Sequence, residues 1–433
     1  MKSKLALLGG GKIRKEVFPP HPIIGKEERK EVLEVLKTGL LSGFIAKAGD
    51  SFLGGPKVLQ LEKEFGEYFN TKYAMAVNSA TAGLHAAIAS AGIGPGDEVI
   101  VSPYTMSASA SSILMANAIP VFADIQDDIF CLNPDKVQEA ISPRTKAILV
   151  VHLFGHPADM DAILSVAKKY NLIVIEDCAQ SPGAVYKRKF VGTIGDIAVF
   201  SLNQHKTITT GEGGVIVTNN DELAEKARLI RNHGEVVVSD MNRDDIVNVL
   251  GWNYRMTELE AAVGIAQFRK LDKLTQSRIE LADYLTEKLS NYEGITTPVV
   301  YPDSKHVYFV YSIKYDEKEV GITRELFVKA LNAEGISFGA GYVKPIYLEP
   351  LYQKKICYGR NGCPFTCPYY KGKVYYNKGL CPTAEKLYEK ELMLTGLCRF
   401  PLTIRDIEDV VRAFKKIFDN IDDLKVLNEG EIK

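Results

Sequence analysis

The segments LIVIED (172–177) and IAVFSLNQHK (197–206) decide the fold class that we predict for this chain. Each segment begins with an unbroken apolar run, which is typical of a strand buried on both faces of a parallel sheet. Asp177 ends the first segment and Lys206 ends the second. Ligands of open α/β sheets bind beyond the carboxyl ends of the strands, so both residues are placed where a site is expected.

The sequence on either side continues the same pattern. Short apolar strands alternate with helical stretches, which indicates an α/β fold with a mainly parallel sheet. The further strands are expected at 74–77, 98–102, 119–122, 147–152 and 214–218.

Changes in pattern divide the chain into three parts. Residues 1–55 read as an N-terminal arm with one short helix at 27–38, and residues 56–285 read as the large α/β domain. Residues 286–433 read as a smaller C-terminal α+β domain, in which 307–315 alternates like an antiparallel strand. A Cys- and Tyr-rich insertion occupies about 350–382.

Composition and charge narrow the class of function. The 433 residues are 46% hydrophobic and 25% charged, and the formal net charge is −1. Such a balance gives no global attraction to nucleic acid or to an anionic membrane. The first residues lack the apolar run of a signal peptide, so we expect the protein in the cytoplasm, with its seven cysteines reduced.

Lys206 and Asp177 match the two requirements of pyridoxal-5'-phosphate (PLP) chemistry. A lysine that forms an imine with the cofactor needs a lowered pKa, and an acidic partner must keep the pyridine nitrogen protonated. Lys206 lies in a loop rich in Thr and Gly, which would keep the backbone close to a ligand.

A third element could bind the cofactor phosphate. The segment NSATAGLHAA (78–87) places small residues and free backbone N–H groups at a helix start, which is an anion site. Ser201, at the end of its strand, could add a hydroxyl.

Six ordered motifs resemble those of the DegT/DnrJ/EryC1/StrS family of PLP-dependent sugar aminotransferases, over about residues 20–300. They are NSATAGLHAA, GDEVIVSPYT, VIEDCAQSPGA, GDIAVFSLNQHKTITTGEGG, RNHG and NYRMTELEAA. The resemblance implies a fold-type-I, aspartate aminotransferase-like architecture and a role in amino-sugar biosynthesis.

The resemblance also implies a role for each matching residue. Lys206 matches the lysine that holds the cofactor and shuttles the proton, and Asp177 matches the partner of the pyridine nitrogen. Gln180 matches a glutamine near the cofactor ring, and Met106 stands where many relatives stack an aromatic ring. Some relatives with His in place of the lysine are dehydratases, and Lys206 disfavours that activity.

Phosphate binding and assembly follow from the same resemblance. Ala80, Thr81 and Ser201 match the phosphate-binding residues. Asn253 matches an asparagine that reaches the phosphate from the neighbouring subunit, which implies a homodimer with shared active sites.

The substrates expected from the resemblance are an amino-acid donor, glutamate, and a nucleotide-linked keto-hexose, in a ping-pong reaction. The segment CPTAEKLYEKE (381–391) also resembles the branch that acts on keto-cyclitols of the inosose type, which is the alternative. In the substrate loop PIYLEPLY (345–352), Tyr347 stands where many relatives have His. A PLP- or metal-binding protein without turnover is the alternative from another class.

Four cysteines gather in the C-terminal insertion, while no metal is predicted at the active site. Cys357, Cys363, Cys367 and Cys381 lie within 25 residues, and the spacing of Cys363 and Cys367 is compatible with zinc. A substrate-loop insertion with free thiols or, in a thermophile, a disulfide is favoured over a structural metal. His152, on a strand, is a further candidate on the cofactor side.

Overall fold

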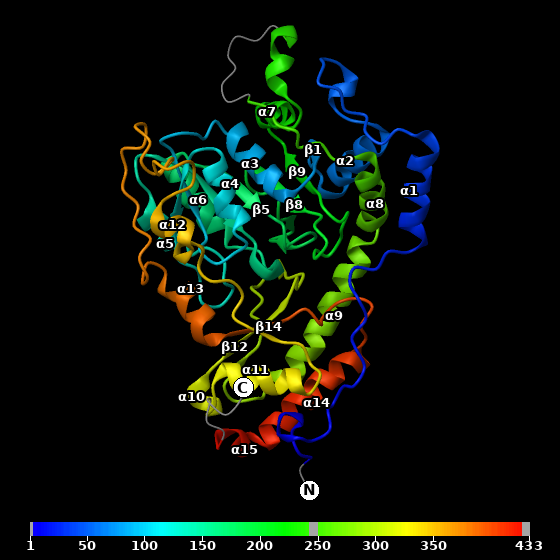
Figure 1. Ribbon diagram of the computed structural model, residues 1–433, viewed down its shortest axis with the longest axis vertical. Coiled ribbons are helices and arrows are strands. Elements are labelled where there is room, and N and C mark those ends of the chain that lie inside the picture. Colours follow the sequence, from blue (N-terminus) through cyan, green and yellow to red (C-terminus); the bar gives the residue numbers. More distant parts are fainter. Residues whose placement is uncertain (1–2, 242–249, 427–433) are drawn as a thin grey trace.

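The computed structural model describes residues 3–241 and 250–426 (Figure 1). A large sheet with its helices forms the upper part of Figure 1 and a smaller unit forms the lower part. The long helix α9 (Leu271–Leu289) runs between them. No described helix is both long and apolar enough to cross a membrane.

The large sheet has seven strands in the order β1-β9-β8-β5-β4-β2-β3. Strand β9 is antiparallel to both of its neighbours, and the other pairs are parallel, which confirms the predicted mainly parallel sheet. The strands are β1 (Tyr73–Val77), β2 (Glu98–Val101), β3 (Ile119–Phe122), β4 (Thr145–Val151), β5 (Ile173–Asp177), β8 (Ile197–Ser201) and β9 (Gly214–Thr218).

The register aligns the carboxyl ends of the central strands. Asp177 pairs with Val151 on β4 and with Val199 on β8. Ser201 ends β8 two residues further along. The polar residues that follow β4, β5 and β8 therefore meet at one edge of the sheet.

Helices cover this sheet, and close packing of α3 depends on a glycine. Ser79 caps α3 by accepting a hydrogen bond from the backbone N–H of Ala82. A Cβ atom at Gly83 would lie 2.8 Å from Cγ1 of Val199, so only glycine lets this helix approach β8 so closely. The helices are α2 (Pro56–Phe69), α3 (Ala80–Ser90), α4 (Ala108–Met115), α5 (Pro134–Ala140), α6 (Met160–Tyr170), α7 (Asp221–Arg231) and α8 (Glu258–Phe268).

The N-terminal arm contacts both parts of the molecule. The backbone N–H of Ala6 donates to Glu334 of the small domain at 2.8 Å. The predicted helix of the arm is α1 (Lys26–Thr38), which packs on α8 through Glu28, bonded to Gln267 at 2.6 Å. The arm therefore joins the two domains.

The small domain contains a four-stranded antiparallel sheet in the order β10-β12-β14-β13. The predicted strand at 307–315 is shorter, because the backbone N–H groups of Val307 and Phe309 donate to Gly155 and Phe154 of the large domain. The elements are β10 (Ile295–Thr296), β12 (Tyr311–Tyr315), α10 (Glu317–Val320), α11 (Arg324–Ala333), β13 (Gly339–Ala340), β14 (Leu392–Thr395), α14 (Ile404–Asp419) and α15 (Ile421–Lys425). The predicted boundary near 285 falls inside α9 and stays a prediction.

The Cys- and Tyr-rich insertion packs against the large domain. Tyr376 donates a hydrogen bond to the carbonyl of Pro120 at 2.7 Å, and Tyr370 donates to Glu98 at 2.8 Å. Both tyrosine side chains are buried. The remaining short elements are β6 (Val185–Tyr186), β7 (Lys189–Phe190), β11 (Ser304–Lys305), α12 (Pro350–Lys354) and α13 (Pro382–Lys386).

Candidate active site

Lys206 lies in the loop that follows β8, and its amine is largely withdrawn from water. Its Nζ atom lies 4.6 Å from the centre of the Phe309 ring. Burial lowers the pKa of Lys206 from its ordinary value, and the nearby charge of Asp177 works in the opposite direction. A lowered pKa provides the neutral amine that a nucleophile requires.

Asp177 is held in one orientation at the end of β5, with 5% of its surface exposed. Its Oδ2 atom accepts a hydrogen bond from the Ser109 hydroxyl at 2.7 Å. Its Oδ1 atom accepts from the backbone N–H of Ala179 at 3.0 Å. Both carboxylate oxygens are therefore oriented, and the charge of Asp177 acts on the Lys206 amine.

Gln180 connects the two domains beside this pair. Its Oε1 atom accepts from the backbone N–H of Phe154 at 2.9 Å, and its amide donates to the Tyr342 hydroxyl at 3.1 Å. The backbone N–H of Tyr342 in turn donates to the Tyr104 hydroxyl at 3.1 Å. The side chain of Gln180 is thus fixed by partners from both domains.

The predicted phosphate site brings together the start of α3 and the end of β8. Ala80 and Thr81 are the first residues of the helix, where backbone N–H groups have no partner within the helix. Gly214 pairs with Ser201, and a Cβ atom at Gly214 would lie 2.8 Å from the backbone nitrogen of Ala80. The start of α3 therefore lies close to the end of β8. Ser201 accepts a hydrogen bond from Asn203 at 3.3 Å and can still donate its proton to an anion.

Two predicted residues lie on the surface. Met106 is 56% exposed, just before α4. Asn253 is also exposed, and its carbonyl accepts a hydrogen bond from the Asn78 amide at 3.1 Å. Contacts of these two residues with a cofactor stay predictions.

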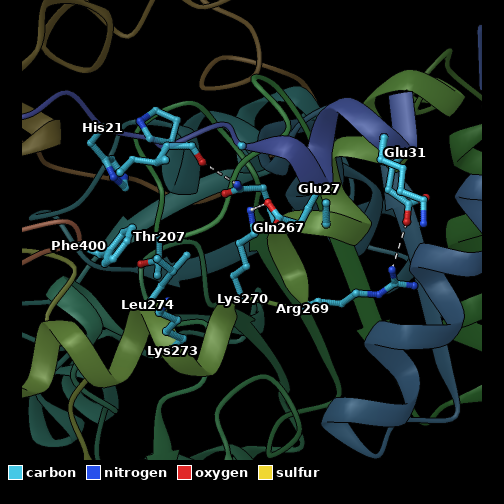
Figure 2. A pocket seen from close by; sticks show the side chains of 15 residues that line it. His21, Glu27, Glu31, Thr207, Gln267, Arg269, Lys270, Lys273, Leu274 and Phe400 are labelled. Atoms are coloured by element: carbon cyan, nitrogen blue, oxygen red, sulfur yellow. Dashed lines mark hydrogen bonds and ion pairs between the residues drawn. The ribbon is translucent and has the colours of Figure 1, made fainter. Parts of the chain in front are cut away.

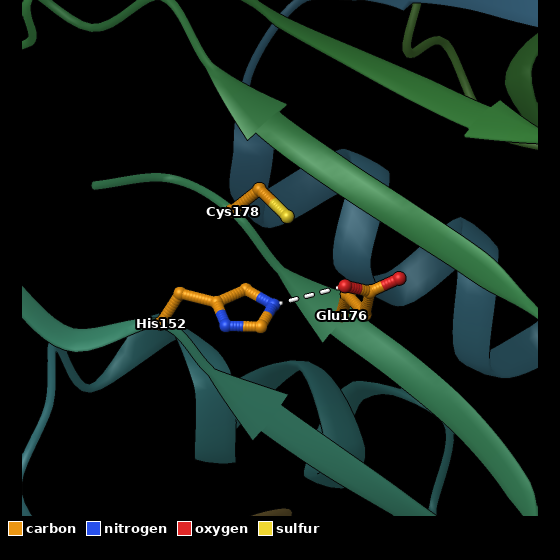
Figure 3. Close-up of side chains that lie close together, drawn as sticks. All are labelled: His152, Glu176 and Cys178. Atoms are coloured by element: carbon orange, nitrogen blue, oxygen red, sulfur yellow. Dashed lines mark hydrogen bonds and ion pairs between the residues drawn. The ribbon is translucent and has the colours of Figure 1, made fainter. Parts of the chain in front are cut away.

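His152 belongs to a buried cluster with Glu176 and Cys178 (Figure 3). Its Nε2 atom lies 2.9 Å from Glu176, and its Nδ1 accepts from the backbone N–H of Ala158 at 3.0 Å. Glu176 also accepts hydrogen bonds from the backbone of residues 192, 194 and 195. Since protein groups occupy both ring nitrogens and the carboxylate, we assign this cluster a structural role.

The four cysteines of the insertion do not form a common site. Among residues 3–241 and 250–426, the one group of three or more side chains compatible with a metal is the His152 cluster. Cys381 is buried, and burial, followed by the charges of Asp124 and Glu385, raises the pKa of its thiol. None of the four cysteines forms a disulfide in this structure.

Tyr347 is a core residue in this structure. It is fully buried, its hydroxyl contacts Glu385, and it accepts a hydrogen bond from the backbone N–H of Cys381 at 3.2 Å. Its ring packs 5.7 Å from that of Phe122. The side chain therefore anchors the loop and is not offered to a substrate.

Four residues near the site had no signal in the sequence. Ser109, Phe309 and Tyr342 come from distant segments, and His21 bonds to the backbone carbonyl of Lys206 at 3.1 Å. No local motif singles out these residues, because only the tertiary fold brings them to Lys206.

Residues 22–372 match the family model described as DegT/DnrJ/EryC1/StrS aminotransferase family. The chain belongs to this family. The protein is therefore a PLP-dependent sugar aminotransferase, and the alternative of a binding protein without turnover is set aside.

Named relatives and a solved structure agree with this assignment. The GDP-perosamine synthase of Caulobacter vibrioides is 40% identical, over 76% of this chain and 85% of that protein. A Micromonospora echinospora protein named as an L-glutamine:3-amino-2,3-dideoxy-scyllo-inosose aminotransferase is 32% identical, over 98% and 99%. The structure of an aminotransferase from Psychrobacter cryohalolentis is 30% identical, with a TM-score of 0.80 over 94% of this chain and 100% of that one.

The residues present fit PLP. The lowered pKa of the Lys206 amine suits an imine, the oriented Asp177 carboxylate suits a pyridinium nitrogen, and the start of α3 suits a phosphate. The individual residue roles remain predictions at this point.

Proposed function

We propose that this enzyme transfers an amino group from glutamate to a nucleotide-linked keto-hexose by a ping-pong mechanism. The observation that carries the proposal is the lowered pKa of the Lys206 amine, in a family of sugar aminotransferases. Burial lowers this pKa, and the nearby charge of Asp177 partly offsets the effect. The GDP-linked name of a 40% identical relative supports a nucleotide-linked substrate.

Lys206 has two tasks in this proposal. It binds the cofactor, and its released amine then moves the proton between the donor carbon and the cofactor. When bound, PLP supplies an electron sink that stabilises negative charge on the carbon that loses its proton. Phe309, beside the Nζ atom, excludes water from the amine.

The other site residues bind and orient in this proposal. Asp177, oriented by Ser109, contacts the ring nitrogen, and Gln180 lies near the ring. The N–H groups at the start of α3 and the Ser201 hydroxyl hold the phosphate. Met106, whose side chain is exposed in the monomer, covers the cofactor ring in this proposal.

We propose a homodimer as the active form. Apolar side chains are exposed on α1 and just after it, including Leu33 (55%), Leu36 (54%) and Leu41 (49%). Trp252, adjacent to Asn253, is 41% exposed. Burying these side chains against a second subunit would be favourable, and in this proposal Asn253 reaches the partner's phosphate site. We place the enzyme in the cytoplasm, which fits its seven free cysteines.

A visible absorption spectrum before and after glutamate tests the proposed reaction. Wild-type protein supplied with PLP should show the absorbance of lysine-bound cofactor, and glutamate should convert it to that of pyridoxamine phosphate. Lys206→Ala should show neither, whereas Lys146→Ala, which changes an exposed lysine, should behave as wild type. Wild-type absorbance that glutamate leaves unchanged would contradict the proposed donor reaction.

A keto-cyclitol of the inosose type is the second candidate acceptor. The inosose-related Micromonospora echinospora protein matches 98% of this chain, a share that extends past the family-model match. Adding each acceptor to the pyridoxamine form separates the two. Recovery of the original spectrum with an inosose, and not with nucleotide-linked keto-hexoses, would favour the cyclitol.

A further inference from the structure

His21, in the N-terminal arm, contacts the loop that contains Lys206. Its Nε2 atom lies 3.1 Å from the backbone carbonyl oxygen of Lys206, and 185 residues separate the two in sequence. A carbonyl oxygen can only accept a hydrogen bond, so Nε2 carries the proton and is the donor. The imidazole therefore joins the arm to the backbone of the residue that carries the reactive amine.

The imidazole of His21 is uncharged near neutral pH. Burial is the largest of the effects that lower the pKa of His21 to about 4. The hydrogen bond to the Lys206 carbonyl acts in the opposite direction, and the charges of Arg278 and Arg399 add to the lowering. A neutral imidazole has one N–H group. The bond to Lys206 therefore uses the single donor of the ring and fixes which nitrogen is protonated.

Two hydrogen bonds hold the backbone of Lys206. Its N–H group donates to the carbonyl of Asn203 at 2.9 Å. Its carbonyl accepts from His21, and within residues 3–241 and 250–426 it has no second donor. The hydroxyl of Thr207, the next residue, is buried and has no hydrogen-bond partner in this part of the chain. His21 therefore supplies the hydrogen bond on the carboxyl side of Lys206.

The arm that carries His21 is anchored on both sides. Before His21, Arg14 pairs with Asp406 of the small domain at 3.0 Å. After His21, Glu28 of α1 pairs with Lys270 at the end of α8 at 2.5 Å. Figure 1 shows the arm, in blue, rising from the level of α14 to α1. Both ion pairs are partly buried, so the arm offers a fixed support for the imidazole.

A cavity lies beside the imidazole and the loop (Figure 2). It has a volume of about 620 Å³, with His21, Thr207 and Phe400 at one end and Glu31 and Arg269 at the other. Because side chains do not fill this space, packing restrains this part of the loop less than it would in a dense interior. The hydrogen bond from His21 is a restraint that the surrounding packing does not replace.

We propose that His21 is a positioning residue for Lys206. Its hydrogen bond fixes the backbone from which the Lys206 side chain extends, and this placement keeps Nζ 4.6 Å from the centre of the Phe309 ring. Reactive geometry is sensitive to shifts of about 1 Å, so a loosely held backbone should slow every step in which the amine takes part. This role of His21 rests on the proposed role of Lys206 and adds to it a residue of the N-terminal arm.

Variants that keep or remove the ring donor test this role. His21→Phe keeps a flat ring without an N–H group, and His21→Gln keeps an N–H donor at the end of its side chain. We expect the rate of the spectral change with glutamate to fall about ten-fold or more in His21→Phe and to recover in His21→Gln. Val17→Ala, which changes a side chain of the same arm that is 92% exposed, should match wild type. If His21→Phe does not fold, His21→Leu, which also lacks a donor, takes its place.

The pH dependence of PLP capture separates positioning from stability. If the loop is less fixed, the Lys206 amine is more exposed to water, and the midpoint of capture in His21→Phe should rise towards 10.5, the ordinary pKa of lysine. His21→Gln should keep the wild-type midpoint. A lower melting temperature of His21→Phe, with the midpoint and the rate of the folded protein unchanged, would show a purely structural contact and would overturn the proposed role.

Capture of PLP needs no amino donor, so the two proposals can fail separately. Equal absorbance of wild type and Lys206→Ala would remove the role of Lys206 and that of His21 with it. Wild type that captures PLP through Lys206 and does not react with glutamate would contradict the donor reaction alone, and the capture midpoints would still decide on His21. Equal midpoints and equal rates in wild type, His21→Phe and His21→Gln would remove His21 alone.

Discussion

At the scale of single residues, the central feature is an amine that must be neutral to react. Burial favours the uncharged form of Lys206, and the charge of Asp177 opposes this effect, so the net result is a pKa lowered from 10.5. A group with a lowered pKa loses its proton at a lower pH than a free lysine. We therefore expect Lys206 to react over a wider range of pH than an exposed lysine.

Capture of PLP by the cofactor-free protein should show this pH range. The rate should rise with pH, with a midpoint below 10.5, because only the neutral amine attacks the aldehyde. Absorbance after rapid mixing at a series of pH values measures the profile. A blocked free lysine in the same buffers is the control. A midpoint equal to that of the free lysine would mean that burial does not tune the amine.

At the scale of elements, helix α4 positions the end of strand β5. Ser109, fully buried on α4, is the side chain that donates to the Oδ2 atom of Asp177. The hydrogen bond joins two elements that are not adjacent in sequence. Helix α4 therefore contributes to the site through Ser109, which orients Asp177 and does not need to contact the substrate.

Removing this bond should reduce catalysis more than stability. Ser109→Ala leaves a buried acceptor with one donor fewer, and we expect kcat to fall about ten-fold. Ser111→Ala, on the same helix with its hydroxyl directed to Ala108, is the matched control. Steady-state kinetics and thermal melting of both variants make the comparison. Equal kcat values in the two would remove Ser109 from the positioning of Asp177.

At the scale of the whole molecule, the proposed homodimer predicts that two inactive variants regain activity when they form mixed dimers. Lys206→Ala and Asn253→Asp disable different parts of a site, and in a shared site these parts come from different chains. Refolding the two variants together should give about a quarter of wild-type activity, because half of the dimers are hybrids and each holds one intact site. Activity equal to the mean of the two separate variants would show that the sites are not shared.

The sequence predicted the sheet well because its strands carry a local signal. Apolar runs such as 172–177 and 197–201 appear as β5 and β8, and the polar residues after them meet at one edge. The strand at 307–315 was predicted too long, since its first half bonds to the large domain. That bonding depends on distant backbone groups, which periodicity does not report.

The sequence by itself determined the mainly parallel sheet and the family, because apolar periodicity and ordered motifs are local properties of the chain. Only the tertiary structure decided that Tyr347 lies in the core and that Ser109 orients Asp177. It also decided that Arg278 is buried and donates to the carbonyls of Tyr308 and Phe309. Burial and charge balance depend on which distant segments meet in space, and local sequence patterns do not show which segments those are.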